Sequence, residues 1–292
     1  MELSIVYDRE IDGNIEDLIR ASGELGHKAT LVSINKISAA LGPSSRFWVK
    51  GKILRDLDAC LLRSIGSGSY ELMCRRIDLL EQMELSGILV INPVNAFRRA
   101  KDKYAALYAL ANSGIKIPRT IVTESSVFAY HFFKTRVPFV YKPLTGSMGY
   151  GSSKFDDVDV AYNVLHLLER SGRPLYLQEY LKTNGTDIRA FVIGGKVVAA
   201  IERRAMRGSW KTNIAQGGKA LKKALSADLA EAAIKACEVL GLEYGGVDLV
   251  DTSRGPYVLE VNSSPSWKGL RAATEIDVAK LLVNHVESKL KR

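Results

Sequence analysis

The sequence predicts an α/β domain followed by two α+β subdomains, and three observations lead to this prediction. Strands alternate with helices over residues 1–93, which is the pattern of a parallel sheet covered by helices. A glycine-rich segment at 145–151 lies between a strand and a helix, and a turn at 251–256 separates two short strands. We place the three parts at residues 1–94, 95–185 and 186–292 of the 292-residue chain.

The first part has the strand and helix signals of a small parallel sheet. The predicted strands are 3–7, 29–34, 59–65 and 88–91, and the predicted helices are 15–25 and 70–85. Gly66-Ser-Gly68-Ser69, between a strand and a helix, is similar to part of a dinucleotide-binding loop. It lacks the third glycine and an acidic residue about 20 residues further on. We therefore predict a simple turn in which Ser69 caps the next helix.

The remaining elements follow from apolar spacing and from glycine and proline positions. Helices are predicted at 104–111, 159–170 and 226–240, the last ending at Gly241, and strands at 137–143, 174–180, 188–193, 196–204, 246–250 and 257–261. The turn Gly194-Gly195 joins the predicted strands 188–193 and 196–204 into a hairpin.

The last hairpin carries a candidate metal site. Glu260 and Asn262 are two residues apart on one strand, so their side chains leave the same face. Folding the hairpin around 252–255 brings Asp248 roughly opposite Glu260. Carboxylate and amide oxygens are ligands that Mg²⁺ prefers, especially when ATP phosphates complete the coordination. Spacing alone leaves open the alternative that the two carboxylates face different ways and are simply solvated.

The glycine-rich segment is a candidate phosphate-binding loop. Gly146, Gly149 and Gly151, with Ser147 among them, would let backbone N–H groups approach phosphate oxygens closely. Lys142, at the end of the preceding strand, adds a cation near the same place. The loop is not a Walker A loop, because no Gly-Lys-Ser/Thr follows it. A plain flexible turn is the alternative.

Positive charge is concentrated in two segments of the chain. The net charge is +9, yet residues 96–136 carry +6 and residues 173–223 carry +8, so the rest is acidic. This distribution predicts a polyanionic ligand between the two segments. A generally basic surface and nucleic-acid binding are the alternatives. Aromatic residues are not interleaved with the basic ones as a base-stacking surface requires, which disfavours nucleic acid.

Cysteine and hydropathy patterns predict a cytoplasmic protein with no membrane partner. Cys60, Cys74 and Cys237 form no C-x-x-C pair and are expected to be free thiols in a reducing compartment. No apolar run approaches the roughly 20 residues that span a bilayer. The N-terminal residues lack the pattern of a signal peptide.

Six motifs occur in an order that carries a family resemblance. They are Lys142-Pro-Leu-Thr-Gly-Ser-Met-Gly-Tyr-Gly151, Gln178-Glu-Tyr180, Asp187-Ile-Arg189, Lys211-Thr-Asn213, Gly246-Val-Asp248 and Leu259-Glu-Val-Asn-Ser-Ser-Pro265. The ordered set resembles the RimK-like α-L-glutamate ligases, a branch of the ATP-grasp superfamily. The resemblance covers residues 95–285 closely and the first 94 residues by domain type only. It implies an ATP-grasp fold with an N-terminal Rossmann-like domain.

The resemblance also implies roles for individual residues. Lys142 would bind the phosphates and Lys103 would approach the nucleotide. The other nucleotide-site residues would be Glu179 and Tyr180, which line the adenine pocket, and Asp187, Lys211, Thr212 and Asn213. Asp248, Glu260 and Asn262 would hold two Mg²⁺ ions, for which Mn²⁺ can substitute.

The expected reaction joins a carboxylate to an amine. ATP would phosphorylate the carboxylate, and the amine would attack the acyl phosphate to give an amide, ADP and phosphate. Arg203, and more weakly Arg189, are candidates for stabilising the acyl phosphate and the tetrahedral intermediate. The alternative for Arg203 is a surface ion pair with Glu202 or Asp187. Residues 206–218 are a candidate lid that keeps water away.

The family implies L-glutamate as the amine and an acidic carboxylate as the acceptor. That acceptor would be a coenzyme tail of the methanopterin or deazaflavin type, or a protein C-terminus. Ligases that act on an amino-group carrier protein in lysine or arginine biosynthesis remain an alternative, although their pattern differs from Ser263-Ser-Pro-Ser-Trp267. An ATP-grasp scaffold that only binds is disfavoured, because Lys142, Asp248, Glu260 and Asn262 are all present. A homodimer or homotetramer is also expected from the family.

Overall fold

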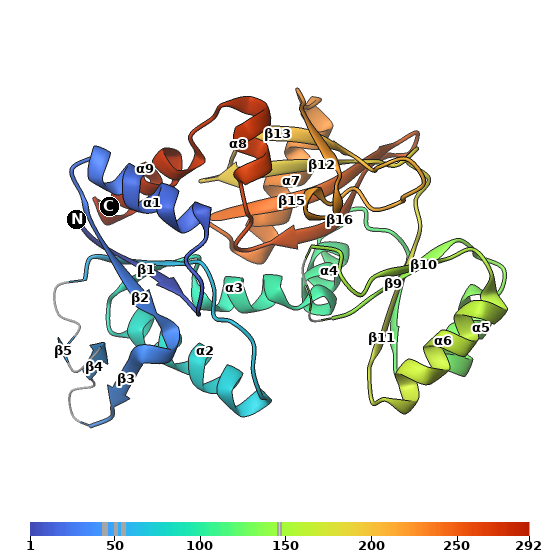
Figure 1. Cartoon of the computed structure of the whole chain (residues 1–292), viewed down its shortest axis with the longest axis horizontal. Helices are drawn as coiled ribbons and strands as arrows, with labels where there is room; N and C mark the ends of the chain where they lie inside the picture. The colour runs from blue at the N-terminus through green and yellow to red at the C-terminus, as the bar shows by residue number, and fades with distance from the viewer. Residues whose placement is uncertain (43–45, 50–51, 54–56, 145, 147, 292) are drawn as a thin grey trace.

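The computed structural model describes residues 1–42, 46–49, 52–53, 57–144, 146 and 148–291. Ser147, one of the candidate loop residues, therefore lies outside the described residues. Three larger sheets and one small sheet form the framework (Figure 1).

The N-terminal sheet is parallel, as predicted. Its order is β2-β1-β6-β7, and each neighbouring pair is parallel. The strands are β1 (Glu2–Tyr7), β2 (Lys28–Ser33), β6 (Ala59–Leu62) and β7 (Leu89–Ile91), and the helices are α1 (Gly13–Glu24) and α2 (Tyr70–Leu85). Ser69 caps α2 by accepting a hydrogen bond from the Leu72 N–H at 3.3 Å, so the predicted turn and cap are confirmed.

A small antiparallel sheet in this region was not predicted. It consists of β3 (Ile37–Ala40), β4 (Arg46–Val49) and β5 (Lys52–Ile53), and the short 3₁₀ helix η1 (Ile34–Lys36) precedes it. β3 and β4 have four residues each and β5 has two, so each is too short to show the sustained alternation that marks a half-buried strand.

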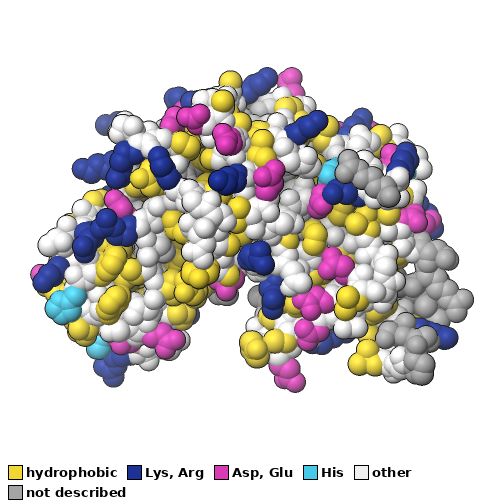
Figure 2. Space-filling model, turned by 180° about the vertical axis from the view of Figure 1, so that it is seen from behind, with side chains coloured by type: hydrophobic (Ala, Val, Ile, Leu, Met, Phe, Trp, Pro, Cys, Tyr) yellow, Lys and Arg dark blue, Asp and Glu magenta, His cyan; other side chains and the backbone are white. Residues whose placement is uncertain are grey.

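The second sheet forms a separate lobe. Its order is β10-β9-β11-β8, all antiparallel, with β8 (Thr120–Thr123), β9 (Phe139–Lys142), β10 (Ser153–Phe155) and β11 (Leu175–Glu179). Helices α5 (Ser126–Phe133) and α6 (Val158–Arg170) cover one face. The space-filling view shows this lobe set apart from the rest of the molecule by a hollow (Figure 2).

The third sheet is antiparallel and five-stranded, with the order β14-β13-β12-β15-β16. The strands are β12 (Thr186–Ile193), β13 (Lys196–Arg204), β14 (Lys219–Lys222), β15 (Tyr244–Thr252) and β16 (Gly255–Asn262). The 3₁₀ helix η2 (Ile214–Gln216) precedes β14, and α7 (Ala227–Leu240) ends at Gly241, where φ is 75°. Glycine adopts this left-handed conformation without strain, which explains why the helix ends where the sequence predicted.

Four further α-helices of the described chain pack against the sheets. They are α3 (Val94–Lys101), α4 (Lys103–Asn112), α8 (Lys268–Thr274) and α9 (Val278–Leu290). Apolar residues of α3 and α4 share a core with α7 and the five-stranded sheet. Apolar residues of α8 and α9 share another core with β1, β6 and α1 of the N-terminal sheet. The N-terminal sheet and the five-stranded sheet are therefore packed through one common core, whereas most of the lobe packs in a cluster of its own.

Candidate active site

A cavity of about 900 Å³ lies between the lobe and the five-stranded sheet. The strands β9 and β11 supply one wall, and β12, β13, β15 and β16 supply the other. Nearly all of the described candidate residues line it: Lys103, Lys142, Gly146, Gly149, Glu179, Tyr180, Asp187, Arg189, Arg203, Lys211, Thr212, Asn213, Asp248, Glu260 and Asn262. The exception is Gly151, whose φ of 74° and closeness to Pro143 mark it as a turn residue.

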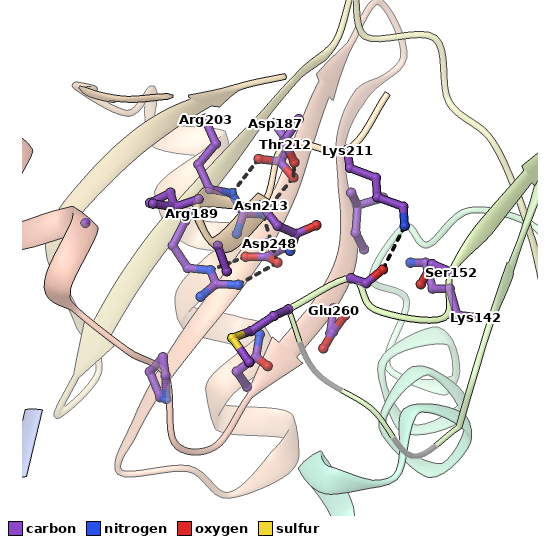
Figure 3. Close-up of a pocket in the computed structure, with 18 of the residues that line it drawn as sticks. Lys142, Ser152, Asp187, Arg189, Arg203, Lys211, Thr212, Asn213, Asp248 and Glu260 are labelled. Carbon is purple, nitrogen blue, oxygen red and sulfur yellow. Dashed lines mark hydrogen bonds and ion pairs between the residues drawn. The ribbon is translucent and has the colours of Figure 1, made fainter. Parts of the chain in front are cut away.

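The glycine-rich loop lies against the segment that follows β13. A Cβ added to Gly149 would be 2.5 Å from Asn213 Oδ1, so only glycine permits this approach. Lys211 Nζ donates a hydrogen bond to the Gly149 carbonyl oxygen at 3.1 Å (Figure 3). Gln216 Nε2 donates to the Met148 carbonyl oxygen at 2.7 Å. The loop and the candidate lid thus meet at the mouth of the cavity.

Three lysines supply positive charge to the cavity. Lys142 Nζ donates to Gln178 Oε1 at 2.6 Å, and Lys103 Nζ donates to the Gly146 carbonyl oxygen at 3.1 Å. Burial lowers the pKa of Lys142, and the nearby Glu260 carboxylate partly opposes this effect. Within the described part of the chain, no carboxylate forms an ion pair with Lys103, Lys142 or Lys211. Their charges are therefore available for an anionic ligand.

Arg203 and Asp187 form a buried ion pair at the centre of the cavity wall. Arg203 Nε and Nη2 each donate to one Asp187 oxygen at 2.7 Å, and Thr212 Oγ1 donates to the same carboxylate at 2.6 Å. Arg203 is only 4% exposed. The alternative of an ion pair at the surface is therefore wrong, because the pair is buried, although Asp187 is indeed the partner. Glu202 instead pairs with Arg204 at 2.7 Å.

Asp248 is held by two arginines. Arg189 donates to both of its carboxylate oxygens, through Nε and, at 2.7 Å, through Nη2 (Figure 3). Arg203 Nη2 lies 2.9 Å from Asp248 Oδ2. Burial would raise the pKa of Asp248, but the charges of Arg189 and Arg203 lower it to about 2. Asp248 is therefore ionised at neutral pH.

The predicted juxtaposition in the last hairpin is confirmed. Asp248 lies directly opposite Glu260 in the β15–β16 register, and Asn262 lies two residues further along β16. The arginines occupy three of the roughly four acceptor positions of the Asp248 carboxylate. Among the described residues, Glu260 forms no ion pair, and Asn262 Nδ2 is buried without a hydrogen-bond partner.

These residues fit a divalent cation that binds together with a nucleotide. The described residues contain no cluster of three His, Cys, Asp or Glu side chains that could hold a metal by itself. Two carboxylates and one amide leave several positions of an octahedral ion open, which phosphate oxygens and water can fill.

Sequence reasoning assigned no role to three residues that contact Tyr180 or Lys142. Trp210 contacts the Tyr180 ring edge-on, with ring centroids 6.1 Å apart, and Lys154 Nζ lies 4.9 Å from the centre of the same ring. Gln178 binds Lys142. Gln178 belongs to one of the six family motifs and Trp210 adjoins another, which was the available signal, whereas Lys154, on β10, lies outside all of them.

A protein-family model for the RimK-like ATP-grasp domain matches residues 100–286. The chain belongs to the RimK-like ATP-grasp family. The tetrahydromethanopterin:α-L-glutamate ligase of Methanosarcina acetivorans is 30% identical over 313 aligned residues, covering 96% of each chain. A probable α-L-glutamate ligase of Cellvibrio japonicus is 33% identical, covering 94% of this chain and 91% of that protein.

Solved ATP-grasp structures show the same fold. The ATP-grasp ligase PsnB, in a complex with a phosphomimetic precursor variant, Mg and ADP, matches with a TM-score of 0.80. It is 21% identical and the match covers 99% of this chain and 98% of that chain. As a member of the RimK-like family, the protein is an ATP-dependent, ADP-forming ligase. None of its described helices has both the length and the apolar composition needed to cross a bilayer.

Proposed function

We propose that this RimK-like ligase joins L-glutamate to a carboxylate of an acidic acceptor through an acyl phosphate. The observation that carries the proposal is the distribution of charge across one cavity. The lining includes three lysines that form no ion pair among the described residues, and two carboxylates and an amide on the last hairpin. Such a cavity suits ATP, because its phosphates need both cationic donors and a metal-binding face.

Each wall has a distinct role in this proposal. Lys103, Lys142 and Lys211 would hold the phosphates, and Glu179 and Tyr180 would line the adenine pocket. Gly146, Gly149, Asp187, Thr212 and Asn213 would complete the nucleotide site, with Ser147 and Gly151 shaping the loop. Asp248, Glu260 and Asn262 would hold two Mg²⁺ ions, replaceable by Mn²⁺, which offset charge on the transferred phosphoryl group. ATP would then lie between residues 95–185 and residues 186–292.

Arg189 and Arg203 can still act on the reacting groups despite their ion pairs. An arginine has five N–H donors, and both residues use only Nε and Nη2. Nη1 of each donates no hydrogen bond among the described residues. We propose that these remaining donors stabilise the acyl phosphate and the tetrahedral intermediate that forms when the amine attacks.

The nature of the acceptor is inferred from charge and from the relatives. The segments 96–136 and 173–223 carry net charges of +6 and +8 and both contribute residues to the cavity lining, which favours an acidic substrate. The Methanosarcina relative, matched over nearly its whole length, is named for glutamate ligation to tetrahydromethanopterin. We therefore propose a coenzyme tail of the methanopterin or deazaflavin type, or an acidic protein C-terminus, and a homodimer or homotetramer as the active form.

The test is ADP and phosphate formation from ATP and Mg²⁺ with L-glutamate and each candidate acceptor, followed by mass spectrometry of the acceptor. We expect ADP formation that needs both substrates, a mass increase of one or more glutamyl units, and no reaction by Glu260→Ala. If ADP formation does not depend on L-glutamate and mass spectrometry shows another amino acid joined to the acceptor, the proposed amine substrate is contradicted.

A further inference from the structure

The loop that follows the metal-site strand is held by the N-terminal domain. This loop, Ser263–Trp267, starts one residue after Asn262. Asn92, at the end of β7, is fully buried and donates from Nδ2 to the carbonyl oxygens of Ser263 at 2.7 Å and Tyr244 at 2.8 Å. Its Oδ1 accepts from the Tyr244 N–H at 2.9 Å. One side chain thus joins β7 to the start of β15 and to the end of β16.

Arg63, just after β6, makes a second set of contacts with the same loop. Its Nη2 donates to the Pro265 carbonyl oxygen at 3.0 Å, and its guanidinium carbon lies 4.6 Å from the centre of the Trp267 ring. Ser264 Oγ donates back to the Arg63 carbonyl oxygen at 2.5 Å. Arg63 is 8% exposed and has no carboxylate partner among the described residues. Its Nη1 also donates to the Tyr244 hydroxyl at 3.2 Å, so its guanidinium contacts both the loop and the start of β15.

The first helix holds the end of the loop. Asn14 Oδ1 accepts from Ser266 Oγ at 3.2 Å and from the Trp267 N–H at 3.1 Å. Asp17 accepts from Trp267 Nε1 at 3.1 Å, and the Trp267 side chain is fully buried. Every residue of Ser263–Trp267 therefore has a polar contact with the N-terminal domain, although the loop belongs to the other end of the chain.

We propose that Arg63 and Asn92 are positioning residues that hold Glu260 and Asn262 in the geometry that binds the metal. The inference rests on the proposed metal site. Ligand side chains need support to stay within about 0.5 Å of a productive position. Asn262 lies at the end of its strand, so the following loop fixes its backbone. The N-terminal domain then supports the catalytic centre rather than only adjoining it.

The alternative is that these contacts merely dock two domains, and a matched pair of variants separates the two. Arg63→Met removes the guanidinium group, and with it the hydrogen bond to the Pro265 carbonyl oxygen and the positive charge beside the Trp267 ring. Arg76→Met is the control, because Arg76 is a 3%-exposed arginine of the same domain that pairs with Asp8 and the Ile65 carbonyl oxygen, away from the loop. Both variants lose a buried guanidinium group, so a loss of stability alone would affect both.

The measurement is Mn²⁺ binding in the presence of ADP, followed by electron paramagnetic resonance, with ADP binding alone measured by calorimetry. Loss of a residue that orients a metal ligand weakens metal affinity by about 10- to 100-fold. We expect Arg63→Met to weaken Mn²⁺ binding by about tenfold while ADP binding without metal stays within about twofold. Arg76→Met should leave both affinities near those of the wild type.

Equal Mn²⁺ affinities of the folded Arg63→Met and Arg76→Met proteins would overturn the proposal. If Arg63→Met does not fold, Ser264→Ala removes one contact from the loop side, the hydrogen bond to the Arg63 carbonyl oxygen, and leaves the guanidinium group in place. An unchanged Mn²⁺ affinity of Ser264→Ala would then overturn it. Glu260→Ala tests the underlying site separately: wild-type Mn²⁺ binding by this variant would refute the proposed metal site itself.

Discussion

The pairing of Arg203 with Asp187 depends on a single extra residue in β13. The Gly194-Gly195 turn places Ile193 opposite Lys196, and uninterrupted pairing from there would put Glu202 opposite Asp187. A bulge between Phe191 and Val192 in the register puts Arg203 there instead. The sequence identified both charged residues as candidates. It could not show that they face each other in the interior, because a bulge leaves no reliable signal in one sequence.

The buried ion pair leads to a stability prediction. Asp187→Asn preserves the shape of the side chain but leaves Arg203 with a weaker partner in a buried position. Removing one partner of a buried pair costs about 3 kcal/mol or more, so the free energy of unfolding should fall by about 3 kcal/mol. Urea unfolding measures this change. Glu202→Gln is the control, because its two partners, Arg204 and Lys223, both have exposed side chains and the loss should stay below about 1 kcal/mol. Equal losses in the two variants would contradict the prediction.

Glu243 gives a prediction about pH. Its carboxylate accepts hydrogen bonds from His285 Nε2 at 2.8 Å and Lys289 Nζ at 2.6 Å, both on α9. The His285 hydrogen bond, aided by Lys289 and opposed by burial, lowers the pKa of Glu243 to about 2. An unfolded glutamate has a pKa of about 4.3, so this stabilisation is complete above that pH and is lost as pH falls toward 2.

We therefore expect the free energy of unfolding of Glu243→Gln to be lower than that of the wild type by about 1 kcal/mol near neutral pH. This value is smaller than the full pKa shift implies, because Glu243 is partly exposed and solvent screens its interactions. The difference should shrink as the pH is lowered from about 5 to about 3. Chemical denaturation across this range checks it, and a difference that is constant with pH would refute the assigned cause.

At the scale of elements, several helices that the sequence predicted begin with a capping residue and bury one face. Ser69, Asp157 and Ser226 each accept a hydrogen bond from a first-turn N–H, and the helices that follow them were all predicted. Helix α5 was missed because its eight residues are apolar on most sides and show no helical period. Packing against the lobe sheet stabilises it, and one sequence does not reveal that contact.

The segment after β13 gives a prediction about nucleotide binding. Lys211 and Gln216 of this segment already contact the glycine-rich loop, and a nucleotide beneath them would add contacts to both. Limited trypsin digestion should cut after Arg207, which is exposed, in the free protein. A non-hydrolysable ATP analogue with Mg²⁺ should slow this cut several-fold and leave cleavage at the exposed Arg9 unchanged. Equal rates at Arg207 with and without the analogue would show that the segment is not a lid.

At the scale of the whole molecule, the sequence predicted three successive parts but not how they share cores. Leu3 and Ile5 of the first strand pack in one cluster with Phe191, Trp267 and residues of α9. Such contacts join residues more than 180 positions apart, and local periodicity carries no information about them. The lobe, in contrast, has a smaller core formed mostly from residues 129–177.

This difference predicts two levels of stability in one chain. Opening the lobe exposes a small apolar cluster, whereas opening the five-stranded sheet disrupts the cores shared with the other helices. Hydrogen exchange should therefore show lower opening free energies for amides of β9 and β11 than for those of β12 and β15. ADP with Mg²⁺ should raise protection of β9 most. Uniform protection of all four strands would show that the molecule unfolds as one unit.

The bulge in β13 also determines where the chain tolerates a change in length. Val198 has no partner on β12, so its deletion would leave Phe191 opposite Ala199 and Arg203 opposite Asp187. Every residue of β12 is paired with a residue of β13. Deletion of one residue from β12 would therefore bring a different side chain opposite Asp187. In homologous proteins, single-residue gaps in this hairpin should therefore occur on the β13 side, and a designer who shortens the enzyme should begin at Val198.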